Sequence, residues 1–456
     1  MAPTASRDYR LGRFNQIYAH LNLICNANSC DWIELDSAPD LALLKRAIEH
    51  TIDRHPRARS VQYQRGVILG WRHLAQRLPI EIEQRSSINI DPARLRAELL
   101  GNAWNERVPT RDGHPFRFIY TRTPEKHILQ FLTSHTFTDG KAAQLFSGDI
   151  AEAYGRLSAG LPLDQEIVDL PEHNHDRLFL AKLRGAEALR LAWKGVAGFF
   201  HDLVMPAGRL LISGKRSGET DVLMIELPTP MLEALKAAGA RRGSTIHPLL
   251  LLALLRTAQA DAGRQGKRLK HGLRIVDNFS LRRFVDDPRV HKLYDCVAVP
   301  YTLELDPDED DEAVIQRANA RLDALKSGEI LSELYRFRLL FQSSLLLPKA
   351  ATIRFAANVL TRANLICTNV GPIDTRLEHF GPIPVRTYYS FPQLFPPGEV
   401  MVQVSAFRGH LRLVYLYDKG QMSEAQMRER FVYPLIAELS RITGASSLPE
   451  HIAAHG

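Results

Sequence analysis

The sequence predicts a mixed α/β protein made of two α/β halves, and three observations support this fold class. Segments in which apolar residues recur at helical spacing alternate with apolar or alternating segments that are typical of strands. The chain has 456 residues, more than one ordinary domain contains. A basic segment at 177–216 separates two stretches with this mixture of patterns. We therefore expect an N-terminal half at 1–176, a crossover segment at 177–218 and a C-terminal half at 219–456.

The first half contains two helical patterns and several strand patterns. Residues 40–55 place leucine, alanine and isoleucine at helical spacing, with Asp40 suited to cap the first turn and Pro56 ending the run. The run at 126–135 is apolar almost throughout, as expected for a strand buried on both faces. Helical spacing resumes after Gly140. Shorter strand patterns occur at 78–84 and 116–121.

The second half combines strands and helices in the same way. Strand patterns occur at 221–228, 273–284 and 363–368, and a hairpin pattern at 400–417 turns near Gly409. Helical patterns occur at 244–262, 313–326 and 423–442. The acidic loop at 306–312 precedes the second of these helices, where carboxylates favour the positive end of the helix dipole. Two such halves joined by a crossover favour a pocket at their interface.

The positive charge of the chain is concentrated in the crossover. The net charge is +7, and residues 177–216 hold eight basic residues against two acidic ones, a net charge of +6. A nucleic-acid-binding protein would spread its basic residues along a binding face, so we expect no nucleic-acid partner. Two interpretations of 177–216 remain open. The segment is an ordinary solvated helix, or Trp193, Phe199 and Phe200 touch lipid in a peripheral membrane contact while basic side chains meet anionic headgroups or a carrier protein.

The remaining composition points to a soluble, reduced, cytoplasmic protein. Whether it also contacts the inner face of the membrane peripherally stays open at this point. Four cysteines without a CxxC pair predict neither a disulfide scaffold nor a zinc site. The first residues lack the apolar core of a signal peptide, and the strongly apolar run at 249–255 is far shorter than a membrane span. His173 and His175 lie in a polar linker, so we expect no metal, and no bound cofactor is expected either.

The most informative stretch is the hexapeptide from His135 to Gly140, in which Asp139 stands four residues after the histidine. It joins a predicted buried strand to a predicted helix, and such turns expose side chains at the edge of a sheet. Histidine titrates near neutrality and can take a proton from a hydroxyl or amine that attacks a carbonyl group. On these residues alone a second interpretation stays open, in which Asp139 only caps the helix and His135 is hydrogen-bonded in the core.

The order of several stretches resembles the condensation-domain superfamily of CoA-dependent acyltransferases. HTFTDG at 135–140 matches its HxxxDG motif, and weaker matches are IDRHPRAR at 52–59, NFSLRR at 278–283 and TNVGP at 368–372. The superfamily includes condensation domains of nonribosomal peptide synthetases, chloramphenicol acetyltransferase, wax ester synthases and bacterial alcohol O-acyltransferases. The resemblance covers residues 8–440. It implies two chloramphenicol-acetyltransferase-like α/β halves that form a V, with a tunnel at their interface.

The resemblance also implies roles for individual residues. His135 matches the general base, and Asp139 matches a motif aspartate that commonly pairs with an arginine, for which Arg282 is the best match. Gly140 matches a glycine that lets the chain turn tightly into the helix. Ser134 stands where many relatives have a first histidine. Polar side chains that could line the tunnel or approach the reacting carbonyl are Ser134, Asn278, Ser280, Thr368 and Asn369.

The implied function is a free-standing acyltransferase. An acyl thioester, on coenzyme A or on a phosphopantetheinyl acyl carrier protein, would give its acyl group to a hydroxyl or amine of a lipid or secondary-metabolite acceptor. Ester formation is preferred because no synthetase module is fused to the chain. Two alternatives remain: a stand-alone amide-forming condensation enzyme that releases a carrier-bound chain, and a non-catalytic module that binds a carrier protein.

Overall fold

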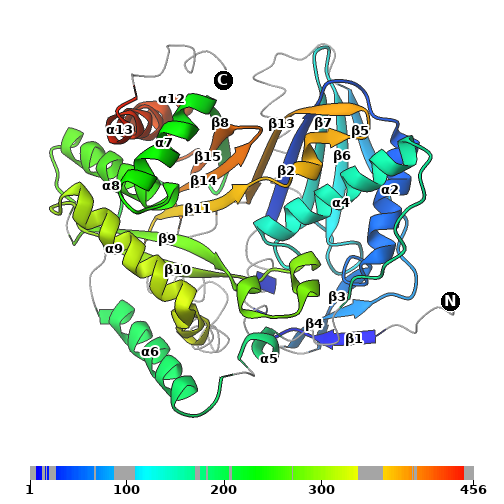
Figure 1. Ribbon diagram of the computed structural model, residues 1–456, viewed down its shortest axis with the longest axis horizontal. Helices are drawn as coiled ribbons and strands as arrows, with labels where there is room; N and C mark the ends of the chain where they lie inside the picture. The colour runs from blue at the N-terminus through cyan, green and yellow to red at the C-terminus, as the bar shows by residue number, and fades with distance from the viewer. Residues whose placement is uncertain are drawn as a thin grey trace. The chain divides into compact units, whose positions relative to one another are not determined.

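The computed structural model describes residues 7–12, 16, 18–19, 27–65, 68–86, 108–169, 175–180, 183–204, 208–269, 271–336, 363–392, 394 and 398–445. The chain forms two compact α/β units (Figure 1). Unit 1 comprises Met1–Lys182, Ser280–Ala298 and Pro372–Gln393. Unit 2 comprises Leu183–Phe279, Val299–Gly371 and Leu394–Gly456. The mixed α/β fold class is confirmed.

The units are not the contiguous halves that the sequence suggests, because two later segments belong to unit 1. We call 280–298 and 372–393 the guest segments. The second guest segment contains strand β13, Ile383–Pro392, which pairs antiparallel with β2, Asn28–Leu35. Strand pairing across more than 340 residues leaves no local signal in the sequence, so a boundary drawn from local patterns misses it.

Unit 1 is built on a six-stranded sheet in the order β12-β13-β2-β7-β6-β5. Its strands besides β13 and β2 are β12 (His379–Phe380), β7 (His127–Ser134), β6 (Phe116–Arg122) and β5 (Ile82–Ser86). The predicted doubly buried run at 126–135 is confirmed as β7, in which only His127 is not fully buried. A smaller sheet, β1-β4-β3, is formed by Arg7–Arg10, Ile68–His73 and Ser60–Arg65.

Two helices lie against one another and cover the large sheet of unit 1 (Figure 1). Helix α2, Leu41–Arg54, begins where predicted, because the Asp40 carboxylate accepts hydrogen bonds from the backbone N–H groups of Ala42 and Leu43. Helix α4, Gly140–Ser158, turns an apolar face to the sheet and buries Phe146, Ile150 and Tyr154.

Unit 2 contains a second six-stranded sheet in the order β10-β9-β11-β14-β15-β8. Its strands are β10 (Ala298–Leu305), β9 (Leu273–Ser280), β11 (Leu365–Pro372), β14 (Val400–Phe407), β15 (His410–Asp418) and β8 (Thr220–Leu227). The predicted hairpin at 400–417 is confirmed. Its turn uses Gly409 at φ 81°, a conformation that favours glycine.

Helices of the described part of unit 2 include α7 (Thr229–Arg241), α8 (Ile246–Arg264), α9 (Asp311–Ala324), α12 (Glu424–Met427) and α13 (Tyr433–Thr443). Helix α8 buries a nearly continuous run of leucines, as its sequence predicts. The Asp310 carboxylate caps α9 by accepting a hydrogen bond from the Ala313 N–H, which assigns the predicted acidic loop its local role.

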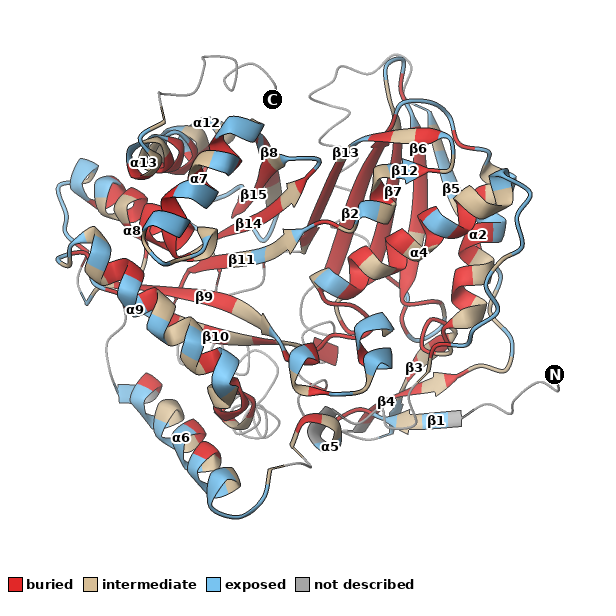
Figure 2. Cartoon of the chain, in the orientation of Figure 1, coloured by how far each residue is buried: buried red, intermediate tan, exposed pale blue. Residues whose placement is uncertain are grey.

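The crossover segment forms two helices, α5 (His175–Leu180) and α6 (Gly185–Val204). In Figure 2 the strands of both sheets are largely buried, whereas α6 carries many exposed residues. Among the described residues, no helix is both long and apolar enough to span a bilayer.

Candidate functional site

The candidate site lies at the turn from β7 to α4. The backbone N–H of His135 donates to the carbonyl of Ala27 at 2.7 Å, which extends the sheet pairing by one residue. The N–H groups of Phe137 and Thr138 both donate to the Ser134 carbonyl, at 2.8 and 3.1 Å, and close a tight turn. His135 therefore stands directly after a buried strand, on a turn fixed by backbone hydrogen bonds.

The hydrogen bond of the His135 ring determines its tautomer. Nδ1 lies 2.8 Å from the carbonyl oxygen of Thr138. A carbonyl oxygen can only accept, so Nδ1 carries the proton and donates it. In the neutral ring the basic lone pair is then on Nε2. This is the nitrogen with which His135 can take a proton from another group.

The surroundings of His135 keep its ring neutral. Burial disfavours the imidazolium and lowers the pKa of His135 below its ordinary value, although the negative charge of Asp139 and the hydrogen bond to the Thr138 carbonyl oppose this shift. The side chain is half-buried rather than enclosed. A neutral, partly accessible imidazole at neutral pH is the form that a general base requires.

Two neighbours of His135 were missed by the sequence analysis. The ring of Tyr18 stacks on the imidazole, with ring centroids 5.4 Å apart and an interplanar angle of 27°, and its hydroxyl donates to the Ala298 carbonyl at 2.9 Å. The Sγ of Cys296 lies 3.8 Å from Nδ1 of His135, and burial raises the pKa of this thiol well above its usual value. Both are distant from His135 in sequence, so no spacing pattern marks them.

Both oxygens of the Asp139 carboxylate are occupied. Oδ1 accepts from the Ala142 N–H at 2.8 Å and caps α4, and Oδ2 accepts from Arg282 at 2.7 Å and from the Val297 N–H at 3.1 Å. Both side chains of the pair with Arg282 are almost fully buried. The carboxylate thus joins the start of α4 to the first guest segment, and the two interpretations of Asp139, helix cap and ion-pair partner, apply together.

Arg282 is held from several sides. Its Nη2 donates to the Asp295 carbonyl at 2.9 Å, so the guanidinium links Asp139 to two positions of the first guest segment. The Oγ of Ser280 lies 3.5 Å from Nη1 of Arg282 and caps the short 3₁₀ turn at 281–284. Ser280 is exposed, and its hydroxyl has this local role in the structure.

Ser134 and Gly140 are the other residues of this turn that the sequence analysis singles out. Ser134 is fully buried, and its hydroxyl exchanges a hydrogen bond of 2.8 Å with that of Thr136. Gly140 is the first residue of α4 and does not adopt a left-handed φ, so backbone freedom does not explain a glycine there. The Ser134 hydroxyl is thus engaged within the turn itself.

Asn278, Thr368 and Asn369 belong to unit 2, where Asn278 lies in the second half of β9 and Thr368 and Asn369 in the middle of the adjacent parallel strand β11. Asn369 is exposed, and its side-chain oxygen accepts from the Gly371 N–H at 2.9 Å. Their approach to a reacting carbonyl stays a prediction.

Tyr388 and Phe391, two aromatic residues of β13, are fully buried. These two are therefore packing residues. His173, one of the two linker histidines, lies outside the described residues. Within the described ranges, no three His, Cys, Asp or Glu side chains are grouped so that they could hold a metal ion.

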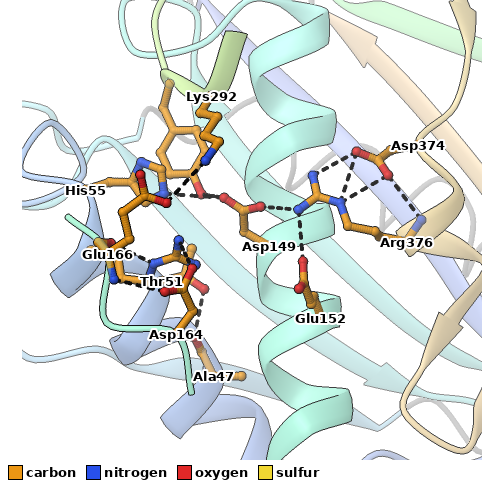
Figure 3. Close-up of polar contacts among 12 residues, drawn as sticks. Ala47, Thr51, His55, Asp149, Glu152, Asp164, Glu166, Lys292, Asp374 and Arg376 are labelled. Atoms are coloured by element: carbon orange, nitrogen blue, oxygen red, sulfur yellow. Dashed lines mark hydrogen bonds and ion pairs between the residues drawn. The ribbon is translucent and has the colours of Figure 1, made fainter. Parts of the chain in front are cut away.

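A second polar cluster, centred on Asp149 of α4, holds both guest segments in place (Figure 3). Nε2 of His55 lies 3.3 Å from the Asp149 carboxylate, which also accepts hydrogen bonds from Tyr294 and Arg376. Burial opposes ionisation of Asp149, but the interactions with His55 and Arg376 prevail and lower its pKa to about 2. Arg376 also pairs with Asp374 at 2.8 Å. Tyr294 and Arg376 come from different guest segments, so one carboxylate binds both to α4.

Comparison with solved structures shows that the chain has the condensation-domain fold. The first condensation domain of the calcium-dependent antibiotic synthetase, in complex with a substrate analogue, is similar with a TM-score of 0.73 and 14% identity over 97% of this chain and 98% of that chain. The starter condensation domain of rhizomide synthetase is similar with a TM-score of 0.68 and 13% identity, over 98% of this chain and 96% of that chain. The condensation domain of the Monacolin K polyketide synthase is similar with a TM-score of 0.70 and 12% identity, over 98% of this chain and 99% of that chain.

No family model matches the sequence, and no curated protein sequence matches it either. The likeness to solved structures extends over nearly the whole chain and confirms the condensation-domain fold, whereas the V arrangement of the halves and the tunnel between them stay predictions.

Proposed function

We propose that the chain is an acyltransferase of the condensation-domain type, with His135 as its general base. The observation that carries the proposal is the hydrogen bond from Nδ1 of His135 to the Thr138 carbonyl, which leaves the basic lone pair on Nε2 of a neutral ring. The condensation-domain fold supports the reaction class, because acyl transfer from a thioester is the chemistry of condensation domains.

In the proposed reaction the acceptor is itself the nucleophile. Its hydroxyl or amine attacks the carbonyl carbon of the acyl thioester while Nε2 of His135 takes its proton. The tetrahedral intermediate then collapses, the carbon–sulfur bond breaks, and the thiolate receives the proton from the imidazolium. The products are an ester or amide and a free thiol, and no acyl-enzyme forms. Binding both substrates next to His135 would supply much of the rate by proximity.

Asp139 and Arg282 act as positioning residues in this proposal. Their buried ion pair fixes the start of α4, and the Thr138 carbonyl that orients the imidazole directly precedes Asp139. Tyr18 and Cys296 pack against the ring and limit its rotation. The base is thus supported by groups from three separated parts of the sequence.

The donor in the proposal is an acyl thioester of coenzyme A or of an acyl carrier protein. A structural neighbour, the starter condensation domain of rhizomide synthetase, was solved as a mutant in complex with C8-CoA and Leu-SNAC. The enzyme would use the thioester as substrate and needs no bound cofactor. We propose a lipid or secondary-metabolite acceptor and prefer a hydroxyl, with the amine of a stand-alone condensation reaction as the alternative.

The proposal is tested by incubating the purified protein with a series of acyl-CoAs, with acylated carrier protein and with hydroxyl and amine acceptors, and following products by mass spectrometry. His135→Ala is expected to lower the rate by about 10²–10⁴-fold, the contribution typical of a general base. His379→Ala is the matched control, because His379 is an exposed histidine of unit 1.

Each outcome selects one function. Turnover of carrier-bound donors alone, with an amide product, selects the stand-alone condensation enzyme. Carrier-protein binding without turnover by the wild type selects the non-catalytic module. An unchanged rate in the folded His135→Ala variant refutes the catalytic role of His135.

A further inference from the structure

Helix α6 presents two opposite faces that are both suited to packing, and only one of them is buried. Its inner residues Leu191, Gly195 and Asp202 are buried in unit 2. At about 3.6 residues per turn, these positions share one side of the helix.

The inner face fixes the rotation of α6. A Cβ at Gly195 would lie 2.6 Å from the backbone oxygen of Ser332, so the helix approaches the 331–336 segment as closely as glycine permits. Asp202 is buried and forms ion pairs with Arg336 and, at 3.2 Å, with Arg274 of β9. Turning α6 to bury its other face would break these buried ion pairs, which is costly.

The outer face carries a stripe of large apolar side chains. Leu189, Trp193, Phe200 and Val204 are 73%, 71%, 57% and 76% exposed. Their spacing of four, seven and four residues places them on one side, opposite the inner face. Isolated exposed apolar residues are common, but a contiguous helical stripe of this kind marks an interaction surface.

Charged residues border this stripe. Arg190 and Lys194 directly follow the stripe residues Leu189 and Trp193 and are exposed, and Lys194 pairs with Glu329 at 2.6 Å. The acidic residues of α6, Glu187 and Asp202, lie two positions from stripe residues and therefore on the far side of the helix. The stripe is consequently bordered by positive charge on one side.

We propose that the outer face of α6 binds the surface of an anionic lipid bilayer, with the helix parallel to the membrane plane. Trp, Phe and Leu beside basic residues are the side chains of interfacial amphipathic helices. Charge complementarity favours this partner over a second copy of the chain, because two such faces would bring their basic borders together, and Glu329 at that border already pairs with Lys194 of its own chain. The surface belongs to unit 2 and the His135 turn to unit 1, and the binding proposed for it does not depend on the proposed reaction.

The test measures binding of the full-length protein to vesicles of phosphatidylcholine with and without phosphatidylglycerol. The wild type should float with the anionic vesicles. The double substitution Trp193→Ser with Phe200→Ser should lower the partition coefficient at least about tenfold, because it removes two aromatic side chains from the interface. Arg190→Gln should lower it about fivefold at low salt, the effect of one basic side chain near an anionic surface.

Quenching by brominated phosphatidylcholine reports insertion directly. The chain has four tryptophans, of which Trp32 and Trp71 are buried, so in a Trp104→Phe background the fluorescence lost on vesicle binding should disappear on Trp193→Phe substitution. Tyr433→Ser is the matched control, since Tyr433 is an exposed aromatic residue elsewhere in unit 2.

Equal flotation of the wild type and the double variant would overturn the proposal. So would concentration-dependent dimerisation of the wild type, lost in the double variant, when neither protein binds vesicles. Binding to an acidic carrier protein in place of vesicles would overturn it equally. Acyl transfer to a water-soluble acceptor should be unchanged in the double variant, which separates this result from any failure of the proposed reaction.

Discussion

Single residues at the turn between β7 and α4 determine the tautomer and the orientation of the His135 imidazole. His135 receives its orientation from a backbone carbonyl, whereas the nearby carboxylate of Asp139 is fully engaged elsewhere. The aspartate therefore acts on the histidine through backbone position and through its charge, not through a direct hydrogen bond to the ring.

The buried Asp139–Arg282 pair should be critical for stability. Arg282→Ala leaves a buried carboxylate without its cation and should lower the free energy of unfolding by about 3–5 kcal/mol, measured by urea denaturation. Arg289→Ala removes an exposed pair with Asp287 in the same guest segment and should change it by less than about 1 kcal/mol. If both substitutions lowered the free energy of unfolding by similar small amounts, the prediction that the buried pair stabilises the protein more than the exposed pair would be wrong.

The rate of the proposed reaction should depend on the ionisation of His135. Because burial lowers the pKa of His135, kcat/KM for a water-soluble acceptor should rise through a pKa below 6.5 and stay level through neutral pH. The folded state then binds fewer protons than the unfolded state, so the contribution of this group to stability falls as pH drops below 6.5. A rise in rate centred above pH 6.5 would disagree with the environment described for this ring.

At the scale of secondary-structure elements, the close packing of α6 on the backbone of residues 331–336 should contribute to stability. Gly195→Ala gains about 1 kcal/mol in helix propensity but forces a Cβ against the Ser332 backbone oxygen, which cannot move as a side chain can. The clash should prevail and lower stability by about 1–3 kcal/mol in thermal unfolding.

The comparison variant for this prediction is Gly198→Ala on the same helix. A Cβ there meets only the side-chain Cδ of Arg336, at 3.4 Å, so the substitution should be neutral or stabilising. Equal effects of the two substitutions would mean that the tight contact of α6 with 331–336 is absent in solution.

Local elements could be predicted from the sequence, because their signals are local. The Asp40 cap, the apolar run of β7 and the turn at Gly409 all follow from neighbouring residues. Strand β13 could not, since its aromatic, proline-containing sequence also suits a loop, and its burial depends on pairing with β2. For the site, the motif identified His135 and Asp139, and the family resemblance suggested Arg282. Tyr18 and Cys296 emerged only from the folded chain.

At the scale of the whole molecule, the same fold is found in proteins with different reactions. The solved neighbours include the epimerization domain of a tyrocidine synthetase, with a TM-score of 0.63 and 15% identity, beside the condensation domains. A shared fold therefore does not decide the reaction, which depends on the groups and substrates that meet at the site. The experiments on His135 therefore carry more weight for function than the overall similarity.

The two guest segments also constrain how the polypeptide matures on the ribosome. Residues 1–182 of unit 1 are synthesised first, yet Arg282 follows only after residues 183–279 of unit 2, and β13 only after residues 299–371 as well. Until β13 is synthesised, the edge of β2 that it will cover can pair with other strands. Until Arg282 is synthesised, the Asp139 carboxylate lacks the cation with which it pairs in the folded chain. Nascent unit 1 must stay incomplete through most of translation, so protection by chaperones would be needed earliest along that uncovered strand.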